Sequence, residues 1–200
     1  MKNHPYSICI DPGHGGKDPG AVNKRLGIKE KDINLSVALL MRRSCWTGDY
    51  LFKSYMTRRK DEFVSLSDRC KKAGFFKVNA FMSIHTNARP MRGKPGIEIE
   101  IFHCPGSKKG REFANITLGL LLGEVRKATD VISRGVKEKA FYVLKHTTMP
   151  AILVELGFIS DDEEALFLNE PINQKMMAKA LLEPVELFFE GGENEWISQN

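Results

Sequence analysis

The sequence predicts a single α/β domain with a mostly parallel, twisted sheet of about six strands, flanked by helices on both faces. Short β-rich runs alternate along the chain with longer segments of helical periodicity, which is typical of α/β layer structures. A length of 200 residues is enough for one sizeable core. The composition, with 42% hydrophobic and 28% charged residues, is that of an ordinary globular protein.

Six segments have the composition of strands. The most regular is "GIEIEIFHC", where the isoleucines alternate with Glu98 and Glu100. Because successive side chains of a strand point to opposite faces, we expect one buried face and one acidic face here. The expected strands are residues 6–11, 50–58, 80–88, 96–104, 141–144 and 151–158.

Five segments have helical patterns. Apolar residues recur at helical spacing from about Glu30, Ser65 is a suitable N-cap, and Asp161 and Asp162 favour a helix start. Pro171 separates two helices near the C-terminus. The expected helices are residues 30–45, 65–76, 108–128, 161–171 and 172–191.

The charge of the chain favours an anionic partner. The formal net charge is +5 and the pI is about 9.0, which suits nucleic acid, a membrane surface or an acidic wall polymer. Lys and Arg are scattered and no nucleic-acid-binding motif is present, so we expect no nucleic acid. The apolar runs are too short for membrane insertion. The four cysteines form no C-x-x-C pair and are typical of reduced thiols.

Four polar residues stand where apolar sequence gives way: His14, Glu30, His85 and Glu155. Each of the first three has a structural alternative, as a hydrogen-bonded loop residue, a helix-start carboxylate or a half-buried histidine. Loops at the carboxyl ends of parallel strands meet in one crevice, so the four could lie together. Two imidazoles and a carboxylate suit Zn²⁺ and leave a fourth position open. No short metal motif such as H-E-x-x-H supports a zinc site independently.

Six segments together resemble a known family. In chain order they are "IDPGHGGKDPGA", "GIKEKDINL", "MTRRKDEFVSLSDRC", "FMSIHTNA", "GIEIEIF" and "MPAILVELGFISDDEEALFL". Over nearly the whole chain this pattern is similar to the zinc-dependent N-acetylmuramoyl-L-alanine amidases of bacteria and their phages. The resemblance implies that His14, Glu30 and His85 hold one Zn²⁺ ion and that Glu155 is the catalytic carboxylate.

The resemblance also implies a reaction. The expected activity is hydrolysis of the amide bond between N-acetylmuramic acid and L-alanine in peptidoglycan. Amide hydrolysis needs a polarised carbonyl and an activated nucleophile, which zinc supplies, and a proton for the leaving amine, which Glu155 can deliver. Burial should raise the pKa of Glu155. We expect residues 1–190 to be the catalytic domain and residues 191–200 a C-terminal tail.

Three further residues are weaker candidates. Glu98 could hydrogen-bond a ligand imidazole or could belong to a solvated strand face. Asn87 could be a turn residue or a support for the metal loop. Arg134 could clamp a peptide carboxylate. Two other functions stay open: a metal-independent wall glycosidase that pairs Glu98 with Glu155, and a non-catalytic module that binds wall polymer.

The expected setting is the bacterial cell wall. The N-terminal residues contain no signal peptide, so we expect synthesis in the cytoplasm and release by cell lysis or a phage pore, as for an autolysin or an endolysin, or a fragment of a longer secreted protein. A monomer is expected, with peptidoglycan as its partner.

Overall fold

The computed structural model describes residues 5–47, 50, 52–89 and 96–197, with side chains up to residue 191. Its main sheet has six strands in the order β4-β1-β5-β8-β6-β7, and β2 and β3 form a separate small hairpin. Every neighbouring pair in the main sheet is parallel except β8 with β6. The strands are β1 (Tyr6–Pro12), β2 (Val22–Asn23), β3 (Ile28–Lys29), β4 (Phe52–Met56), β5 (Ala80–Asn87), β6 (Ile97–His103), β7 (Val131–Glu138) and β8 (Ala151–Phe158).

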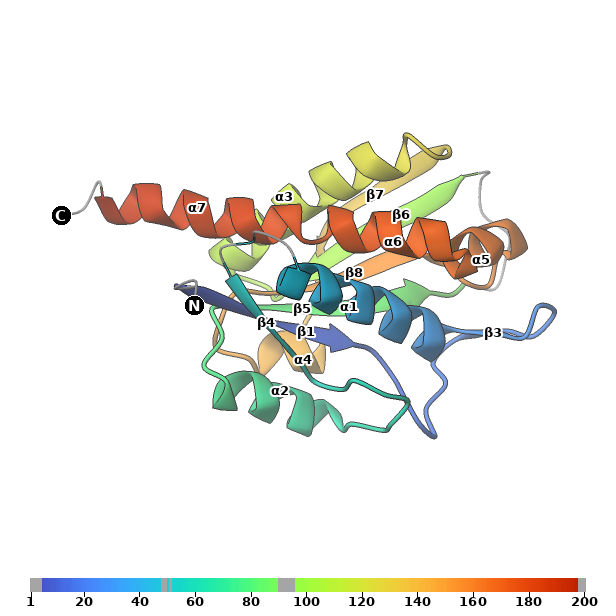
Figure 1. Cartoon of the computed structure of the whole chain (residues 1–200), viewed down its shortest axis with the longest axis horizontal. Coiled ribbons are helices and arrows are strands. Elements are labelled where there is room, and N and C mark those ends of the chain that lie inside the picture. The colour runs from blue at the N-terminus through green and yellow to red at the C-terminus, as the bar shows by residue number, and fades with distance from the viewer. Residues whose placement is uncertain (1–4, 48–49, 51, 90–95, 198–200) are drawn as a thin grey trace.

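Helices cover both faces of the sheet (Figure 1). The larger core lies under α1, α3, α5, α6 and α7, and the smaller core lies on the other face under α2 and α4. The helices are α1 (Glu30–Thr47), α2 (Leu66–Phe75), α3 (Lys108–Val125), α4 (Tyr142–Lys145), α5 (Asp162–Asn169), α6 (Pro171–Ala180) and α7 (Glu183–Ile197). This three-layer architecture confirms the predicted fold class.

Several local signals have the expected effect. The Ser65 side chain accepts a hydrogen bond from the Asp68 amide and caps α2, and Asp161 caps α5 through the amides of Glu163 and Glu164. Helix α1 begins at Glu30 as predicted. It therefore places the Glu30 carboxylate near the carboxyl ends of the central strands β1 and β5.

Two predictions from the C-terminal half are wrong. Residues 141–144, expected as a strand, lie at the short helix α4, which buries Val143 and Leu144 against β8. The sixth strand is instead β7, at the sheet edge. The expected helix over residues 172–191 is two helices, α6 and α7, and α7 continues through residues 191–197 of the expected tail.

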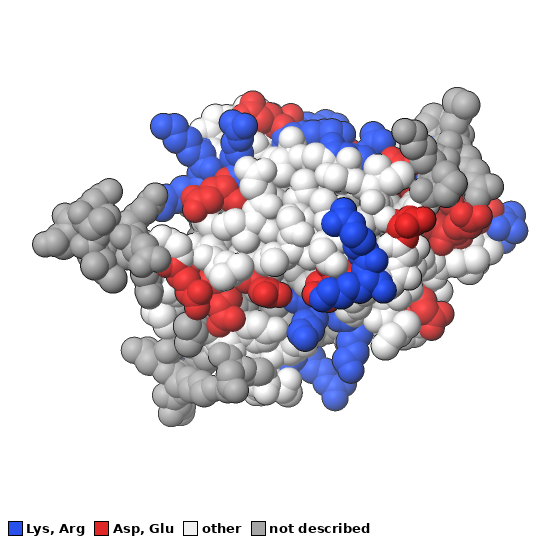
Figure 2. Space-filling view, turned by 90° about the horizontal axis from the view of Figure 1, so that it is seen from above, with Lys and Arg blue, Asp and Glu red and all other residues white. Residues whose placement is uncertain are grey.

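The surface shows no continuous basic stripe on the face seen in Figure 2. Lys and Arg side chains lie there among Asp and Glu side chains and uncharged surface (Figure 2). Within the described residues, no helix has the length and apolar character needed to cross a bilayer. The described cysteines Cys9, Cys45, Cys70 and Cys104 are all free thiols.

Candidate active site

The loop after β1 presents His14 in an unusual backbone conformation. His14 has φ 61°, in the left-handed region that non-glycine residues rarely adopt. Gly13 lets the His85 ring approach, because a Cβ at Gly13 would lie 2.2 Å from His85 Cε1. Gly20 lies equally close to the other side of the site, where a Cβ would be 2.5 Å from Glu30 Oε2. The glycines of this loop therefore make room for the site as well as for the turn.

Two buried arginines hold this loop by its carbonyl oxygens. Arg58 donates to the carbonyls of Pro12 and Gly13 at 3.0 and 2.8 Å. Arg69 donates to the carbonyls of Pro12 and His14 at 2.7 Å each and forms an ion pair with Asp11. Arg58 is 1% exposed and Arg69 3%. Because buried guanidinium groups offer several donors in a fixed geometry, these two arginine side chains determine the path of the loop.

The side chains of His14, Glu30 and His85 meet at one point. One ligand atom from each lies within 4.8 Å of the other two. Glu30 Oε1 is 3.2 Å from His14 Nε2 and 2.9 Å from His85 Nδ1. Each residue comes from a different element: the loop after β1, the first turn of α1 and strand β5. The structure thus brings together the three residues that the sequence predicted as ligands.

Neighbouring polar groups orient this cluster. The other ring nitrogen of His14, Nδ1, lies 2.8 Å from Asp18 Oδ2. The Glu30 carboxylate accepts hydrogen bonds from the backbone amides of Ala21 and Thr86. Metal-binding histidines characteristically hydrogen-bond a carboxylate through the nitrogen that faces away from the metal, and Asp18 is placed to do this.

The electrostatics couple the three side chains. Burial opposes the charged form of His14, but the nearby Glu30 and Asp18 carboxylates outweigh it and raise the pKa of His14 to about 9. Burial also opposes ionisation of Glu30, but hydrogen bonds from His14 and His85 hold the pKa of Glu30 far below its usual range. Glu30 is therefore an anion at neutral pH, ready to hold a cation.

Glu155 lies beside this cluster on β8, in register with His85 on β5. Its side chain is only 9% exposed, and Glu155 Oε2 has no hydrogen-bond partner among the described residues. Burial raises the pKa of Glu155 to about 7, and the negative charges of Glu30 and Glu100 act in the same direction. A carboxyl group with such a pKa can both accept and donate a proton near neutral pH.

One pocket of about 300 Å³ is lined by both histidines of the cluster, by Asp18 and by Glu155. Its rim includes Leu66 and Tyr142, which are 54% and 40% exposed. A partly apolar pocket with a few convergent polar groups is the usual form of a site for a small ligand or a segment of a polymer.

Comparison with known proteins assigns the chain to a family. Residues 8–186 match the family model described as N-acetylmuramoyl-L-alanine amidase. The chain belongs to this family.

Individual relatives of this amidase-family chain agree with the assignment. It is 33% identical to the N-acetylmuramoyl-L-alanine amidase LytC of Bacillus subtilis over 88% of this chain and 34% of LytC. It is 35% identical to the endolysin of Bacillus phage SPP1 over 82% of this chain and 58% of the endolysin. The chain thus spans about a third to three fifths of the length of these curated relatives.

A solved structure shows the same architecture. The crystal structure of an N-acetylmuramoyl-L-alanine amidase from Clostridium difficile 630 superimposes with a TM-score of 0.86 and 28% identity. The match covers 94% of this chain and 98% of that one. The fold of this amidase-family chain is therefore that of the amidase from Clostridium difficile.

The weaker candidates of this amidase-family chain form a separate network. Glu98 and Glu100 are 5% and 4% exposed, so the alternative of a solvated strand face is wrong. Glu98 pairs with Arg89 and Arg134, and within the described residues it does not hydrogen-bond the His14 or His85 imidazole. Asn87 donates to Glu100 at 2.6 Å.

Arg134 is also committed within this network. Its guanidinium group contacts Glu98 and Glu100 at 2.9 and 3.0 Å, and Lys137 pairs with Glu100 as well. Two of its nitrogens, Nε and Nη1, donate to these carboxylates, and the clamp on a peptide carboxylate stays a prediction. The network neutralises two buried carboxylates on β6, next to the strand that carries Glu155.

Sequence reasoning missed the residues that support the site. Asp18 follows His14 by four residues across the Gly15–Asp18 bridge, and an acidic residue at that spacing in a glycine-rich turn is the signal that could have found it. Arg58 and Arg69 lie in the quoted segment "MTRRKDEFVSLSDRC", but their partners are backbone carbonyls. A sequence does not display which carbonyls a side chain will reach.

Proposed function

We propose that this chain is a zinc-dependent peptidoglycan hydrolase that cleaves the amide bond between N-acetylmuramic acid and L-alanine. The observation that carries the proposal is a pocket lined by His14, His85 and the buried Glu155, with the Glu30 carboxylate between the two imidazole rings. Membership of the amidase family supports the bond class, and the half-apolar pocket suits a peptide attached to a sugar.

The donor set fits zinc. His14, Glu30 and His85 offer two nitrogens and one carboxylate oxygen, a combination found in catalytic zinc sites that keep a position open for substrate. The Glu30 carboxylate lies between the two rings, and in the described residues no Lys or Arg side chain is paired with it. A divalent cation would therefore supply the positive charge that protons on the histidines otherwise provide.

Different residues of the site would have different roles in the reaction. When bound, zinc polarises a carbonyl and lowers the pKa of water. Asp18 fixes the orientation of the His14 ring, and Arg58 and Arg69 fix the loop that carries it. Leu66 and Tyr142 contribute apolar surface at the rim of the pocket. Together these contacts fix the positions of the groups that would act on the substrate.

Glu155 is proposed as the proton carrier. Its pKa of about 7 allows the carboxylate to take a proton from the attacking water and the acid to return it to the alanine nitrogen. Breaking the C–N bond then releases a free amino terminus on L-alanine and a carboxylate on the muramic acid. A positioned acid–base group of this kind contributes roughly 10² to 10⁴ in rate.

The two rival functions have less support. A glycosidase would use Glu98 with Glu155, but Glu98 is bound to two arginines and does not line the pocket that contains Glu155. A non-catalytic module does not require a buried carboxylate without a partner, and such a group is costly to keep.

Digestion of purified peptidoglycan tests the proposal. We expect new L-alanine amino termini that disappear after chelation and return with zinc, as measured by mass spectrometry. New reducing ends that resist chelation would instead identify a glycosidase, and intact polymer under all conditions would identify a binding module.

Variants locate the chemistry. Glu155→Gln should lose activity by at least about 10² while keeping its zinc, whereas His14→Ala should lose both. Glu112→Gln is the matched control, because Glu112 is exposed on α3 and does not line the pocket. Zinc content is read by elemental analysis, so the ligand and proton-carrier roles separate. Full zinc and full turnover in His14→Ala would overturn the ligand assignment.

The remaining expectations are part of the same proposal. We take residues 1–190 as the catalytic domain, followed by a short C-terminal extension, and peptidoglycan as the partner. The proposed place of action is the cell wall, and the proposed state in solution is a monomer, which sedimentation would test.

A further inference from the structure

A second pocket, which shares no lining residue with the first, lies at the edge strand β4. It has a volume of about 370 Å³ and lies between the C-terminal half of α1 and β4. All of its lining residues except Arg59 lie outside the segments that carry the family resemblance. They are Arg42, Cys45, Trp46, Phe52, Lys53, Ser54, Tyr55 and Arg59.

The charges around this pocket are of one sign. Its ionised side chains are Arg42, Lys53 and Arg59, and no carboxylate lines it. None of the three forms an ion pair with a described residue, whereas Lys31 on α1 and Arg69 on α2 do. Unpaired cations gathered in a pocket attract a negative ligand.

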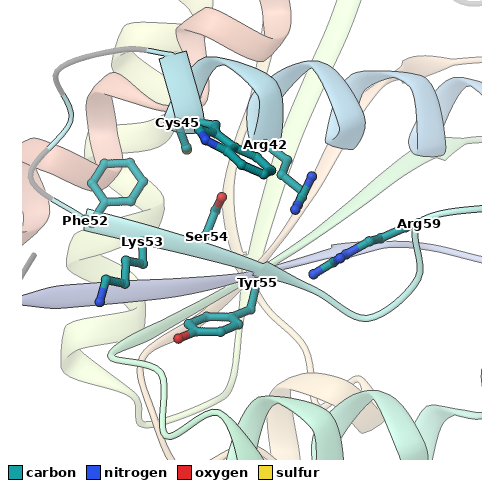
Figure 3. Close-up of a pocket in the computed structure, with 8 residues that line it drawn as sticks. Arg42, Cys45, Phe52, Lys53, Ser54, Tyr55 and Arg59 are labelled. Atoms are coloured by element: carbon teal, nitrogen blue, oxygen red, sulfur yellow. The ribbon is translucent and has the colours of Figure 1, made fainter. Parts of the chain in front are cut away.

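Two of these cations face the same space. Figure 3 shows the Arg42 side chain reaching from α1 and the Arg59 side chain from the segment after β4, with their ends directed toward one another. The Ser54 side chain points to the α1 side of the strand, while Lys53 and Tyr55 point to the other side (Figure 3). The two guanidinium groups and the Ser54 hydroxyl therefore form the polar part of the pocket.

An exposed aromatic ring completes it. Trp46 is 77% exposed, and the Arg42 guanidinium lies 5.3 Å from the centre of its ring. This cation–π contact holds the indole at the pocket while leaving most of it in solvent. An exposed indole beside hydrogen-bond donors is a suitable surface for the apolar face of a sugar ring.

We infer that this pocket binds a sugar phosphate unit, with Arg42 and Arg59 on the phosphate and Trp46 against the sugar. The oxygens of a tetrahedral phosphate diverge, so two guanidinium groups approaching from different sides can each donate to it. A carboxylate presents both oxygens on one side and is satisfied by a single guanidinium group. The inference does not depend on the zinc site or on the proposed reaction.

Titration calorimetry with α-D-glucose 1-phosphate tests the inference, using inorganic phosphate and D-glucuronate as comparison probes at equal ionic strength. We expect the sugar phosphate to bind more tightly than either. Arg42→Met with Arg59→Met should weaken that binding about tenfold or more, because each lost charged donor removes a strong hydrogen bond. Trp46→Ala should reduce the affinity for the sugar phosphate to that for inorganic phosphate.

The control is Arg43→Met, since Arg43 is exposed on the same helix and does not line the pocket. It should bind as the unchanged protein does. Equal binding by the double variant, or no binding by the unchanged protein, would overturn the inference. Glucuronate binding as tightly as the sugar phosphate would overturn the choice of phosphate. Self-association of the double variant without loss of binding would assign these cations to protection of the sheet edge.

Discussion

Replacing Arg69 with Met should destabilise the fold strongly. The guanidinium group makes four hydrogen bonds, to the Asp11 carboxylate and to the carbonyls of Pro12, His14 and Val64. Met fills similar space but leaves all four acceptors without this partner. Asp11 is 1% exposed, so its charge would stay buried with only the hydroxyls of Thr57 and Ser83 as donors.

The expected loss in free energy of unfolding is about 3–5 kcal/mol, the range for breaking one side of a buried ion pair. For a chain of this size each kcal/mol lowers the melting temperature by about 2–4 °C, so a decrease of about 10 °C is expected. Urea unfolding followed by circular dichroism measures the free energy directly.

Lys71→Met provides the matched control on the same helix. Lys71 forms only an exposed pair with Asp68, so its loss should cost less than about 1 kcal/mol. Adding Asp11→Asn to Arg69→Met should recover part of the stability, because it removes the buried charge. If Arg69→Met is as stable as Lys71→Met, the claim that buried guanidinium groups hold the loop is wrong.

Three further predictions concern the site and its surroundings. Gly13→Ala should abolish zinc binding in elemental analysis while leaving the circular dichroism spectrum unchanged, because its Cβ would displace the His85 ring. Asp18→Asn should weaken zinc affinity about 10- to 100-fold in a competition assay with a chelating dye, and unchanged affinity would remove Asp18 from the site. Burial opposes ionisation of Glu98, but its hydrogen bonds with Arg134 and Arg89 outweigh burial and lower the pKa of Glu98. The ionised group therefore stabilises the fold at pH values above the ordinary carboxyl pKa, and this contribution is lost as the pH falls through the lowered pKa. Arg134→Met should therefore reduce the difference in unfolding free energy between pH 7 and acid conditions, and an unchanged difference would contradict the pairing.

The sequence indicated the sheet well where strands are buried and poorly at its edge. Apolar runs such as that of β8 are unmistakable because both faces of the strand are covered. Strand β7 has mostly half-buried and exposed positions, including Arg134, and so lacked an apolar signal. The "FYVL" segment is too short for periodicity to separate a strand from one buried helical turn, and α4 is the latter.

The same contrast between a clear and a missing local signal applies to the residues of the candidate site. His14, Glu30, His85 and Glu155 stood out because each interrupts apolar sequence, whereas their roles as ligands and catalytic carboxylate were implied by the family resemblance. The surroundings of Glu98 were not predicted because alternation in a strand shows which residues share a face but not what covers that face. The covering side chains are Arg89, which follows β5, and Arg134 on β7. Tertiary partners of this kind are not displayed by local spacing.

The left-handed backbone at His14 has a consequence for metal binding at the proposed site. The conformation costs roughly 1–2 kcal/mol for a residue with a side chain, and the contacts that maintain it come from Arg58, Arg69 and Asp18, which belong to the polypeptide. The three proposed ligands are thus held in place by the polypeptide itself. We expect protein treated with a chelator to rebind the proposed metal without a refolding step.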